Sequence, residues 1–377
     1  MSVFPELRRL AEAPHNDRLA AAASAGRPVI GHFCSYVPEE LIHAAGAVPY
    51  RMRAVGSSGT ALGDTFFSSA NCSFVRRVMD QGLRGGFDFL DGIVFMNGCD
   101  HNRRLYDNWR HASPATGFSH LLFVPHASSP ACQEQFRLGL VKLAEFLGGR
   151  LGVAVTDDRL RASIALYDRR RRLLRELAEL RKAAAPPVTG TEFLALMLAV
   201  TAVPPEDAVD LIERALAEAR AGRAPVGTPK LRIFVTGSCL EELSHLELVE
   251  SHGAAVVADA ICLGARTFDR DVGAAGDPLD ALARRYLGRV SCPRMMDDVK
   301  GRMTYTIDAV RDYAADAVIL EKLEFCSMMS GENYIATHEL AKAGIPALAL
   351  TRELYGGEVG QLKTRIQAFY EKLGNRS

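Results

Sequence analysis

A group of chemically reactive side chains follows directly on an apolar segment near residue 100. The stretch "NGCDHNRRLYDNW" (97–109) holds Cys99, His101 and two arginines within a few positions. A thiolate is a nucleophile and a metal ligand, histidine titrates near neutral pH, and guanidinium groups bind phosphates and carboxylates. The stretch therefore predicts a site that holds metal or substrate. The ordinary alternative is a loop with one buried thiol.

Cysteines end four of the apolar runs in the sequence: "VIGHFC", "IVFMNGC", "IFVTGSC" and "VILEKLEFC". Ligands of open parallel sheets bind outside the carboxyl ends of the strands, so four thiols at such ends favour a shared function. Cysteine is also often buried only to fill space, which is the alternative for each one alone. The four residues are Cys34, Cys99, Cys239 and Cys326; we interpret Cys132, Cys262 and Cys292 as structural.

Several common motifs are absent from the sequence. There is no CxxC pair, so a zinc ribbon or ferredoxin-type run is excluded, and the ligands of any metal must come from distant segments. The glycine-rich stretch 55–64 lacks the lysine and hydroxyl residue of a P-loop. Neither GxGxxG nor GxSxG is present in a suitable position. If the chemistry uses ATP, another chain is expected to bind it.

The composition describes an ordinary globular protein. The 377 residues are 48% hydrophobic, and 45 basic side chains balance 45 acidic ones. This balance gives no field that favours nucleic acid or a membrane surface. No apolar run approaches the roughly 18–20 residues that a membrane span needs, and the N-terminal stretch has the pattern of an amphipathic helix rather than a signal peptide. We expect a cytoplasmic protein, in which cysteines are thiols or metal ligands rather than disulfides.

Apolar runs alternate with helical patterns in both halves of the sequence, which is typical of parallel α/β sheets. Predicted strands include "RPVIGHFC", "DFLDGIVFMNG" and "HLLFVPH" in the first half and "LRIFVTGS", "AAVVADAI", "DAVILEKLEF" and "IPALAL" in the second. The middle, from Asp157 to about Arg220, has a helical pattern and no predicted strand. We predict an α/β fold with two flavodoxin-like or Rossmann-like parallel-sheet domains and a helical insert. The predicted ranges are 1–155, 156–229 for the insert and linker, and 230–377.

Longer segments carry a more specific pattern: "GHFCSYVPEELIHAAGAVPYRMR", "NCSFVRR", "DGIVFMNGCDHNRRLYDNW", "VTGSCLEELSHLELVESHGAAVVADAICLGAR" and "LEFCSMMSGENY". Together they resemble the 2-hydroxyacyl-CoA dehydratase and benzoyl-CoA reductase family over nearly the whole chain. Within that family, the first and third segments are most similar to the smaller of the cluster-bearing subunits of ATP-dependent benzoyl-CoA reductase.

This resemblance implies a [4Fe–4S] cluster held by three cysteines. The implied ligands are Cys72, Cys99 and Cys326, and Cys34 is the rival for one of these places because it also matches a family motif. Three thiolates leave one iron open to water, substrate or another ligand. The resemblance also implies a homologous cluster-bearing partner subunit and separate ATP-hydrolysing activator subunits that pass on electrons from reduced ferredoxin. The implied reaction is the reduction of benzoyl-CoA to cyclohexa-1,5-diene-1-carbonyl-CoA, in an organism that degrades aromatic compounds without oxygen.

Two further residues are catalytic candidates. His101 lies two positions from Cys99 and is the leading candidate for the proton donor. The alternative is a surface residue, or one that contacts a metal ligand without reacting. Ser35 follows a strand and is a candidate for the wall of a substrate pocket, whereas an ordinary turn serine is the alternative. Three other functions stay open: the β-type subunit of an (R)-2-hydroxyacyl-CoA dehydratase, a double-cubane electron-transfer protein of the same fold, and a scaffold subunit without a cluster.

Overall fold

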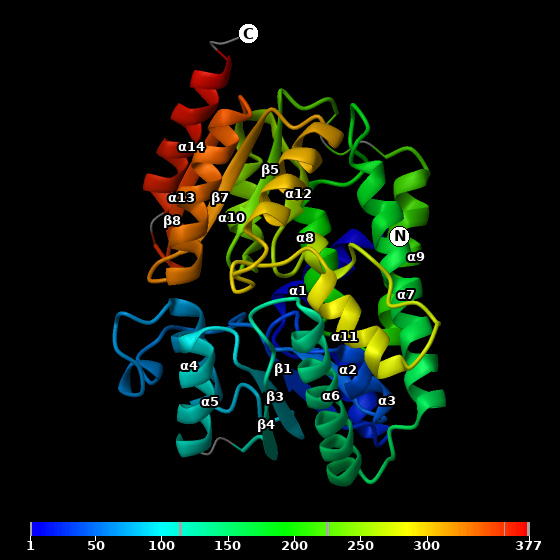
Figure 1. The fold of residues 1–377 in the computed structure, drawn as a ribbon. Coiled ribbons are helices and arrows are strands. Elements are labelled where there is room, and N and C mark those ends of the chain that lie inside the picture. The colour runs from blue at the N-terminus through cyan, green and yellow to red at the C-terminus, as the bar shows by residue number, and fades with distance from the viewer. Residues whose placement is uncertain (1, 113–114, 224, 226, 358, 375–377) are drawn as a thin grey trace.

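Two parallel sheets, one from each half of the chain, form the framework of the molecule (Figure 1). The computed structural model describes residues 2–112, 115–223, 225, 227–357 and 359–374. Within these residues each sheet has four strands, and every pairing is parallel. The predicted fold class, two parallel-sheet α/β domains, is confirmed. The predicted boundaries at 155 and 229 stay a prediction.

The first sheet has the strand order β2-β1-β3-β4, which is the order of flavodoxin-like folds. Strand β2 is not among the predicted strands, because it is only four residues long and contains Pro49. A proline is tolerated there since β2 is an edge strand. The strands are β1 (Val29–His32), β2 (Val48–Arg51), β3 (Gly92–Met96) and β4 (Phe118–Leu122).

Helices cover both faces of the first sheet. One face packs against α3, α6 and α7, and the other packs against α2, α4 and α5. Local sequence sets the ends of these helices: the Asn16 side chain accepts the N–H groups that begin α2, and Gly152 in a left-handed conformation ends α6. The helices are α2 (Asp17–Ser24), α3 (Glu39–Ala44), α4 (Ser73–Leu83), α5 (Asp100–Ala112), α6 (Pro130–Leu151) and α7 (Asp157–Leu180).

The second sheet repeats the same topology, with the order β6-β5-β7-β8. One of its faces packs against α8, α10 and α14, and the other packs against α12 and α13. The elements are β5 (Leu231–Gly237), β6 (Ala254–Ala260), β7 (Ala317–Leu323), β8 (Ala347–Arg352), α8 (Gly190–Ala199), α10 (Leu243–Val249), α12 (Val299–Asp312), α13 (Ser327–Lys342) and α14 (Val359–Gly374).

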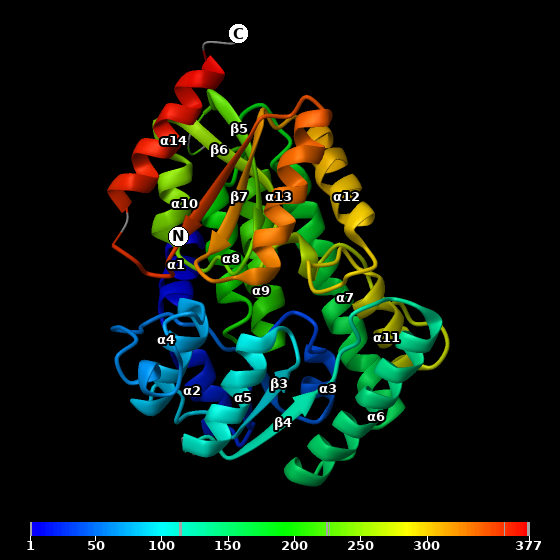
Figure 2. The same cartoon turned by 60° about the vertical axis from the view of Figure 1, so that its left-hand side comes forward.

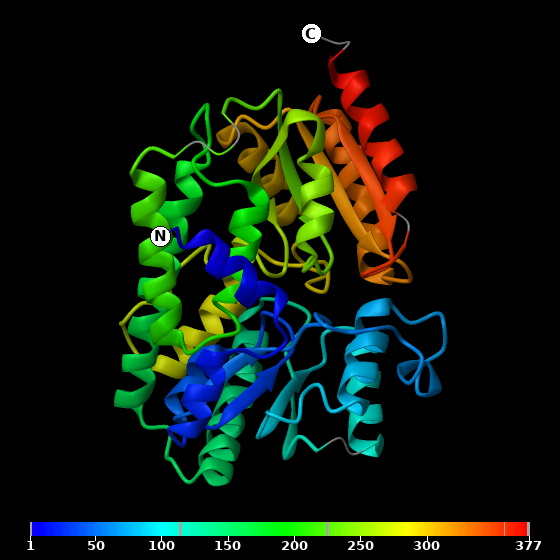
Figure 3. The same cartoon turned by 180° about the vertical axis from the view of Figure 1, so that it is seen from behind.

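Several helices join the two halves. The first helix, α1 (Phe4–Glu12), packs into one apolar cluster with α7, α8 and α9 (Pro205–Arg220) rather than against the first sheet. From behind, α1 is seen between the two sheets (Figure 3). In the opposite direction, α11 (Pro278–Gly288) comes from the second half but packs on α6 in the core of the first. Short 3-10 turns complete the fold: η1 (Gly63–Thr65), η2 (Ser251–Gly253) and η3 (Ala265–Thr267).

The carboxyl ends of the two sheets face each other. In Figure 2 the arrowheads of β7 and β8 point toward the first half, and that of β4 points toward the second. Loops that follow strands of both sheets therefore meet between them. In the described part of the chain, no helix combines the length and apolar character that crossing a membrane requires.

Candidate functional site

Three cysteines from distant segments meet where the strand ends face each other. Cys72, Cys99 and Cys326, the first cysteine set, all carry free thiols. The charges of Cys99 and Cys326 each act on Cys72, and Cys326 also acts on Cys99, so the three thiols are electrostatic neighbours. The structure thus brings together the three predicted ligands. Their assignment as ligands stays a prediction.

Each thiol of the first cysteine set lies at the start of a helix. Cys72 is the N-cap of α4, Cys326 is the N-cap of α13, and Cys99 directly precedes α5. Backbone N–H groups from each first turn donate to these sulfurs. The helix dipole and the N–H groups both favour a negatively charged sulfur. The donors are Phe74 and Val75 for Cys72, His101 and Asn102 for Cys99, and Met328 and Met329 for Cys326.

Burial opposes this stabilisation in the free chain. Desolvation is the largest influence on all three thiols, and it raises the pKa of Cys72 to about 12 and that of Cys99 to about 11. The pKa of Cys326 is also raised by burial. Buried thiols of this kind stay protonated at neutral pH unless a positively charged group binds them.

A second group of thiols, Cys34, Cys262 and Cys292, adjoins the first; we name it the second cysteine set. The charges of Cys34 and Cys262 act on Cys292, and the two sets meet because Cys34 acts on Cys99 and Cys262 acts on Cys326. From the sequence, Cys262 and Cys292 were interpreted as structural. Cys262 follows β6 closely, so the strand-end signal was available for it; Cys292 follows a helix and gave no such signal.

The chemistry of the donor set matches that of an iron–sulfur group. Among the residues that the structure describes, no three His, Cys, Asp or Glu side chains are grouped closely enough to hold one metal ion. An iron–sulfur cluster is larger than one ion, so its ligands stand farther apart, and thiolates are the ligands that it takes. Free thiols, one buried and two half-buried, that already accept backbone N–H groups match this chemistry.

The backbone carries strain beside both sets. Cys34 has φ +66°, and Phe325, which precedes Cys326, has φ +62°. Residues other than glycine rarely adopt this left-handed region, and such strain is concentrated at functional sites. The two turns hold their sulfurs in positions that a relaxed backbone would not give.

The two predicted catalytic residues both contact this junction. His101 Nδ1 accepts the backbone N–H of Cys72 at 3.3 Å, and burial lowers its pKa. The histidine is therefore neutral near pH 7, with its proton on Nε2. The Ser35 hydroxyl accepts a hydrogen bond from Arg289 at 2.9 Å. Their catalytic roles stay predictions.

Direct contacts between the halves hold the first set in place. The buried Ser73 hydroxyl, next to Cys72, accepts the backbone N–H of Leu354 at 2.9 Å. Arg77 of the same helix donates to the carbonyl of Tyr355 at 3.1 Å and its guanidinium lies 5.6 Å from the Tyr355 ring centroid. These contacts fix α4 against the loop after β8, so they set the place of Cys72 relative to the second half.

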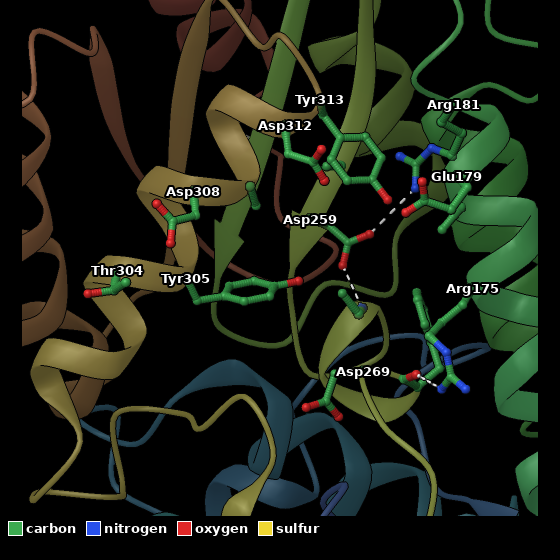
Figure 4. Close-up of a pocket in the computed structure, with 15 residues that line it drawn as sticks. Arg175, Glu179, Arg181, Asp259, Asp269, Thr304, Tyr305, Asp308, Asp312 and Tyr313 are labelled. Carbon is green, nitrogen blue, oxygen red and sulfur yellow. Dashed lines mark hydrogen bonds and ion pairs between the residues drawn. The ribbon is translucent and has the colours of Figure 1, made fainter.

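Two of the cavities in the described part of the chain lie outside the cysteine junction. One of about 440 Å³ borders the first set and is lined by Arg103, Arg104, Phe66 and Asn71 among others. The other, of about 450 Å³, lies between α7 and α12 (Figure 4). Carboxylates outnumber guanidinium groups in its lining, which disfavours the phosphates of coenzyme A. Its charged residues are Arg175, Glu179, Arg181, Asp259, Asp269, Asp308 and Asp312.

Fold and site together define a two-sheet α/β protein with clustered thiols at the facing strand ends. A family described as 2-hydroxyglutaryl-CoA dehydratase, D-component, matches residues 34–373, and the chain belongs to this family. The predicted family resemblance is thus confirmed.

The relatives of the chain are subunits of dehydratases and a reductase. The lactoyl-CoA dehydratase subunit beta of Anaerotignum propionicum is 25% identical over 374 residues, which cover 99% of both chains. A benzoyl-CoA reductase subunit of Thauera aromatica is 27% identical over 358 residues, covering 93% of this chain and 92% of the relative. The putative dehydratase subunit YjiM of Escherichia coli (strain K12) is 26% identical over 359 residues, or 92% of both chains. At these identities the chain is a component of an enzyme of this family, and its substrate is not fixed by the likeness.

Proposed function

We propose that this chain is the cluster-bearing subunit of a cytoplasmic, ATP-dependent acyl-CoA reductase of the benzoyl-CoA reductase type. The observation that carries the proposal is the meeting of Cys72, Cys99 and Cys326 at three helix N-termini between the two sheets. These thiolates would hold a [4Fe–4S] cluster, with Cys34 as the rival ligand. When bound, such a cluster supplies one-electron transfer at low potential.

The residues of the chain itself would exclude water and position a proton. Cys72 is buried and Cys99 and Cys326 are half-buried, which limits the access of water to the site. His101 uses Nδ1 to hold the N–H of Cys72, so Nε2–H is the group that could donate a proton. Ser35, held by Arg289, would hydrogen-bond a polar atom of the substrate.

The proposed partners follow from the same interpretation. They are a homologous cluster-bearing subunit, ATP-hydrolysing activator subunits, reduced ferredoxin and an acyl-CoA. Because a dehydratase subunit and a reductase subunit are similarly distant relatives, the β-type subunit of an (R)-2-hydroxyacyl-CoA dehydratase is the nearest alternative.

A second candidate function is electron transfer by a double-cubane protein of the same fold. The second cysteine set favours it, because three more thiols adjoin the three predicted ligands. A single [4Fe–4S] cluster leaves Cys262 and Cys292 without a role, and Cys34 has one only if it replaces a ligand of the first set. Two joined cubanes would use both sets.

Iron and acid-labile sulfide counts after anaerobic co-expression with the partner subunits separate these candidates. About four irons per chain support a single cluster, about eight support a double cubane, and none would refute both. Turnover of benzoyl-CoA against an (R)-2-hydroxyacyl-CoA then distinguishes the reductase from the dehydratase. A chain with about eight irons and no turnover of either acyl-CoA is an electron carrier.

A further inference from the structure

A cluster of buried arginines surrounds the second cysteine set. Arg266 is 3% exposed, and its Nη1 lies 3.9 Å from the sulfur of Cys262. The positive charge of Arg266 also acts on Cys292, where it lowers the thiol pKa against the larger opposing effect of burial. One guanidinium therefore faces two of the three thiols in this set.

Arg289 adds a second positive charge beside the set. It donates to the Ser35 hydroxyl and to the backbone carbonyl of Arg266, both at 2.9 Å. Cys34 and Cys292 are among the groups whose charges act on it. Its guanidinium also lies 4.1 Å from the ring centroid of Tyr36, which keeps the side chain in place.

Some hydrogen-bond donors of these buried arginines have no partner. Within the described part of the chain, the buried Nε atoms of Arg266 and Arg289 and the hydroxyl of Tyr36 have no hydrogen-bond partner. The carboxylate that acts on Arg289 is Asp269, which it shares with other cations: Asp269 Oδ2 accepts hydrogen bonds from Arg270 and the Val290 N–H, and Oδ1 lies 3.7 Å from Arg285 Nη2. Buried guanidinium groups with idle donors indicate a negatively charged group that completes them.

Among the described residues, the first cysteine set has no comparable pair of buried guanidinium groups beside it. Arg76 is the guanidinium that Cys72 acts on, and its charge is compensated by Asp64, whose Oδ1 lies 2.6 Å from Arg76 Nε. Lys322 acts on Cys326, but its ammonium group bonds Ser330 in an exposed position, where water screens it.

We propose that Arg266, supported by Arg289, raises the reduction potential of an iron–sulfur group held by Cys34, Cys262 and Cys292. Reduction adds one negative charge to such a group, and a buried cation close to its sulfurs stabilises the reduced form. Arg266 is thus a positioning and tuning residue rather than a catalytic one. This inference rests on the second candidate function, in which the second set holds iron.

The test is a redox titration of the anaerobically reconstituted full chain, followed by electron paramagnetic resonance with dithionite as the one-electron donor. The signal that disappears in Cys262→Ala and Cys292→Ala identifies the second group. At the potential where this group is half reduced in the wild type, Arg266→Gln should lower the ratio of reduced to oxidised form about tenfold, or 59 mV for a one-electron couple. Arg266→Lys keeps the charge and should restore most of the ratio.

Controls make the result specific. Arg181→Gln removes another buried guanidinium, one that contacts Asp259 and the Val256 carbonyl, and should leave the ratio unchanged. Arg289→Gln provides a second variant with a smaller shift in the same direction if Arg266→Gln does not fold. An unchanged ratio in a fully loaded Arg266→Gln or Arg289→Gln chain would overturn the inference. If the wild type holds about four irons and Cys262→Ala loses none, the second iron–sulfur group does not exist. That result would refute both this inference and the second candidate function, and it would leave the proposed first site intact.

Discussion

The two cysteine sets lie at the same junction but obtain their positive surroundings in different ways. The first set uses the backbone, because its sulfurs begin helices and accept N–H groups from the first turns. The second set relies mainly on side chains, the guanidinium groups of Arg266 and Arg289, with one backbone N–H, that of Arg294, at Cys292. The backbone contribution follows from the fold and cannot be removed by replacing one side chain. The guanidinium contribution can be changed one residue at a time, so the second set is the part of the site that single substitutions can tune.

The largest expected effect comes from removing one thiol of each set. Cys99→Ala should lose about four irons per chain and all acyl-CoA turnover, because two thiolates do not hold a cluster built for three. Cys262→Ala should keep the iron of the first set and lose any iron bound at the second. Iron content and turnover measured on the same anaerobic preparations check both statements. Cys132→Ala is the matched control, since Cys132 lies in the first turn of α6 and its backbone N–H bonds Ser129. Full iron and turnover in Cys99→Ala would refute the first site.

A buried ion pair lies beside the second set, and it makes the free energy of unfolding depend on pH. Glu40 is fully buried beside Arg171, and it accepts a hydrogen bond from Tyr286 at 2.7 Å. Although burial alone would raise the pKa of Glu40, Arg171 and its other partners hold it below the ordinary 4.5. The pair connects α3, which follows Cys34, with α7 and α11.

Glu40→Gln should therefore lower the free energy of unfolding by about 3–5 kcal/mol at pH 7, because it leaves the buried charge of Arg171 less compensated. A carboxylate with a lowered pKa contributes stability above its unfolded pKa and loses it as pH falls through the folded value. The difference between wild type and variant should thus shrink below pH 4.5. Urea unfolding of both chains between pH 7 and pH 3.5 measures this difference in the free energy of unfolding, and a difference that stays constant over this range would show that folding does not shift the pKa of Glu40.

Most of the fold could be predicted from the sequence because its strands are apolar runs that begin or end at clear turn signals. Seven of the strands overlap predicted segments, and β2 was missed because four residues with a proline carry no periodic pattern. The position of α11 could not be predicted either. Its pattern specifies a helix, but its packing on α6 depends on how the two halves meet.

The candidate site could also be predicted only in part, because its surroundings depend on the tertiary structure. Strand ends and the family resemblance indicated Cys99 and Cys326, and the resemblance added Cys72. Of the second set, Cys34 was indicated by its strand end, Cys262 was interpreted as structural although it follows β6, and Cys292 has no strand before it. The guanidinium groups beside them come from the turn η3 and the end of α11, and only the tertiary structure brings these next to the thiols. Sequence reasoning finds ligands one segment at a time, whereas the electrostatic surroundings of a ligand come from several segments together.

The smallest expected effect concerns the contact that holds the first set between the halves. Ser73→Ala removes the acceptor of the buried Leu354 N–H and should lower the free energy of unfolding by about 1–3 kcal/mol in urea titrations. Ser57→Ala is the control, because Ser57 bonds only within its own surface turn and should have an effect below about 0.5 kcal/mol. Since Ser73 adjoins Cys72, the variant should broaden or shift the paramagnetic signal of the first group and leave that of the second unchanged. Equal changes in both signals would mean that the two sets respond as one unit, and the contrast between a backbone-supported and a side-chain-supported half of the site would not hold.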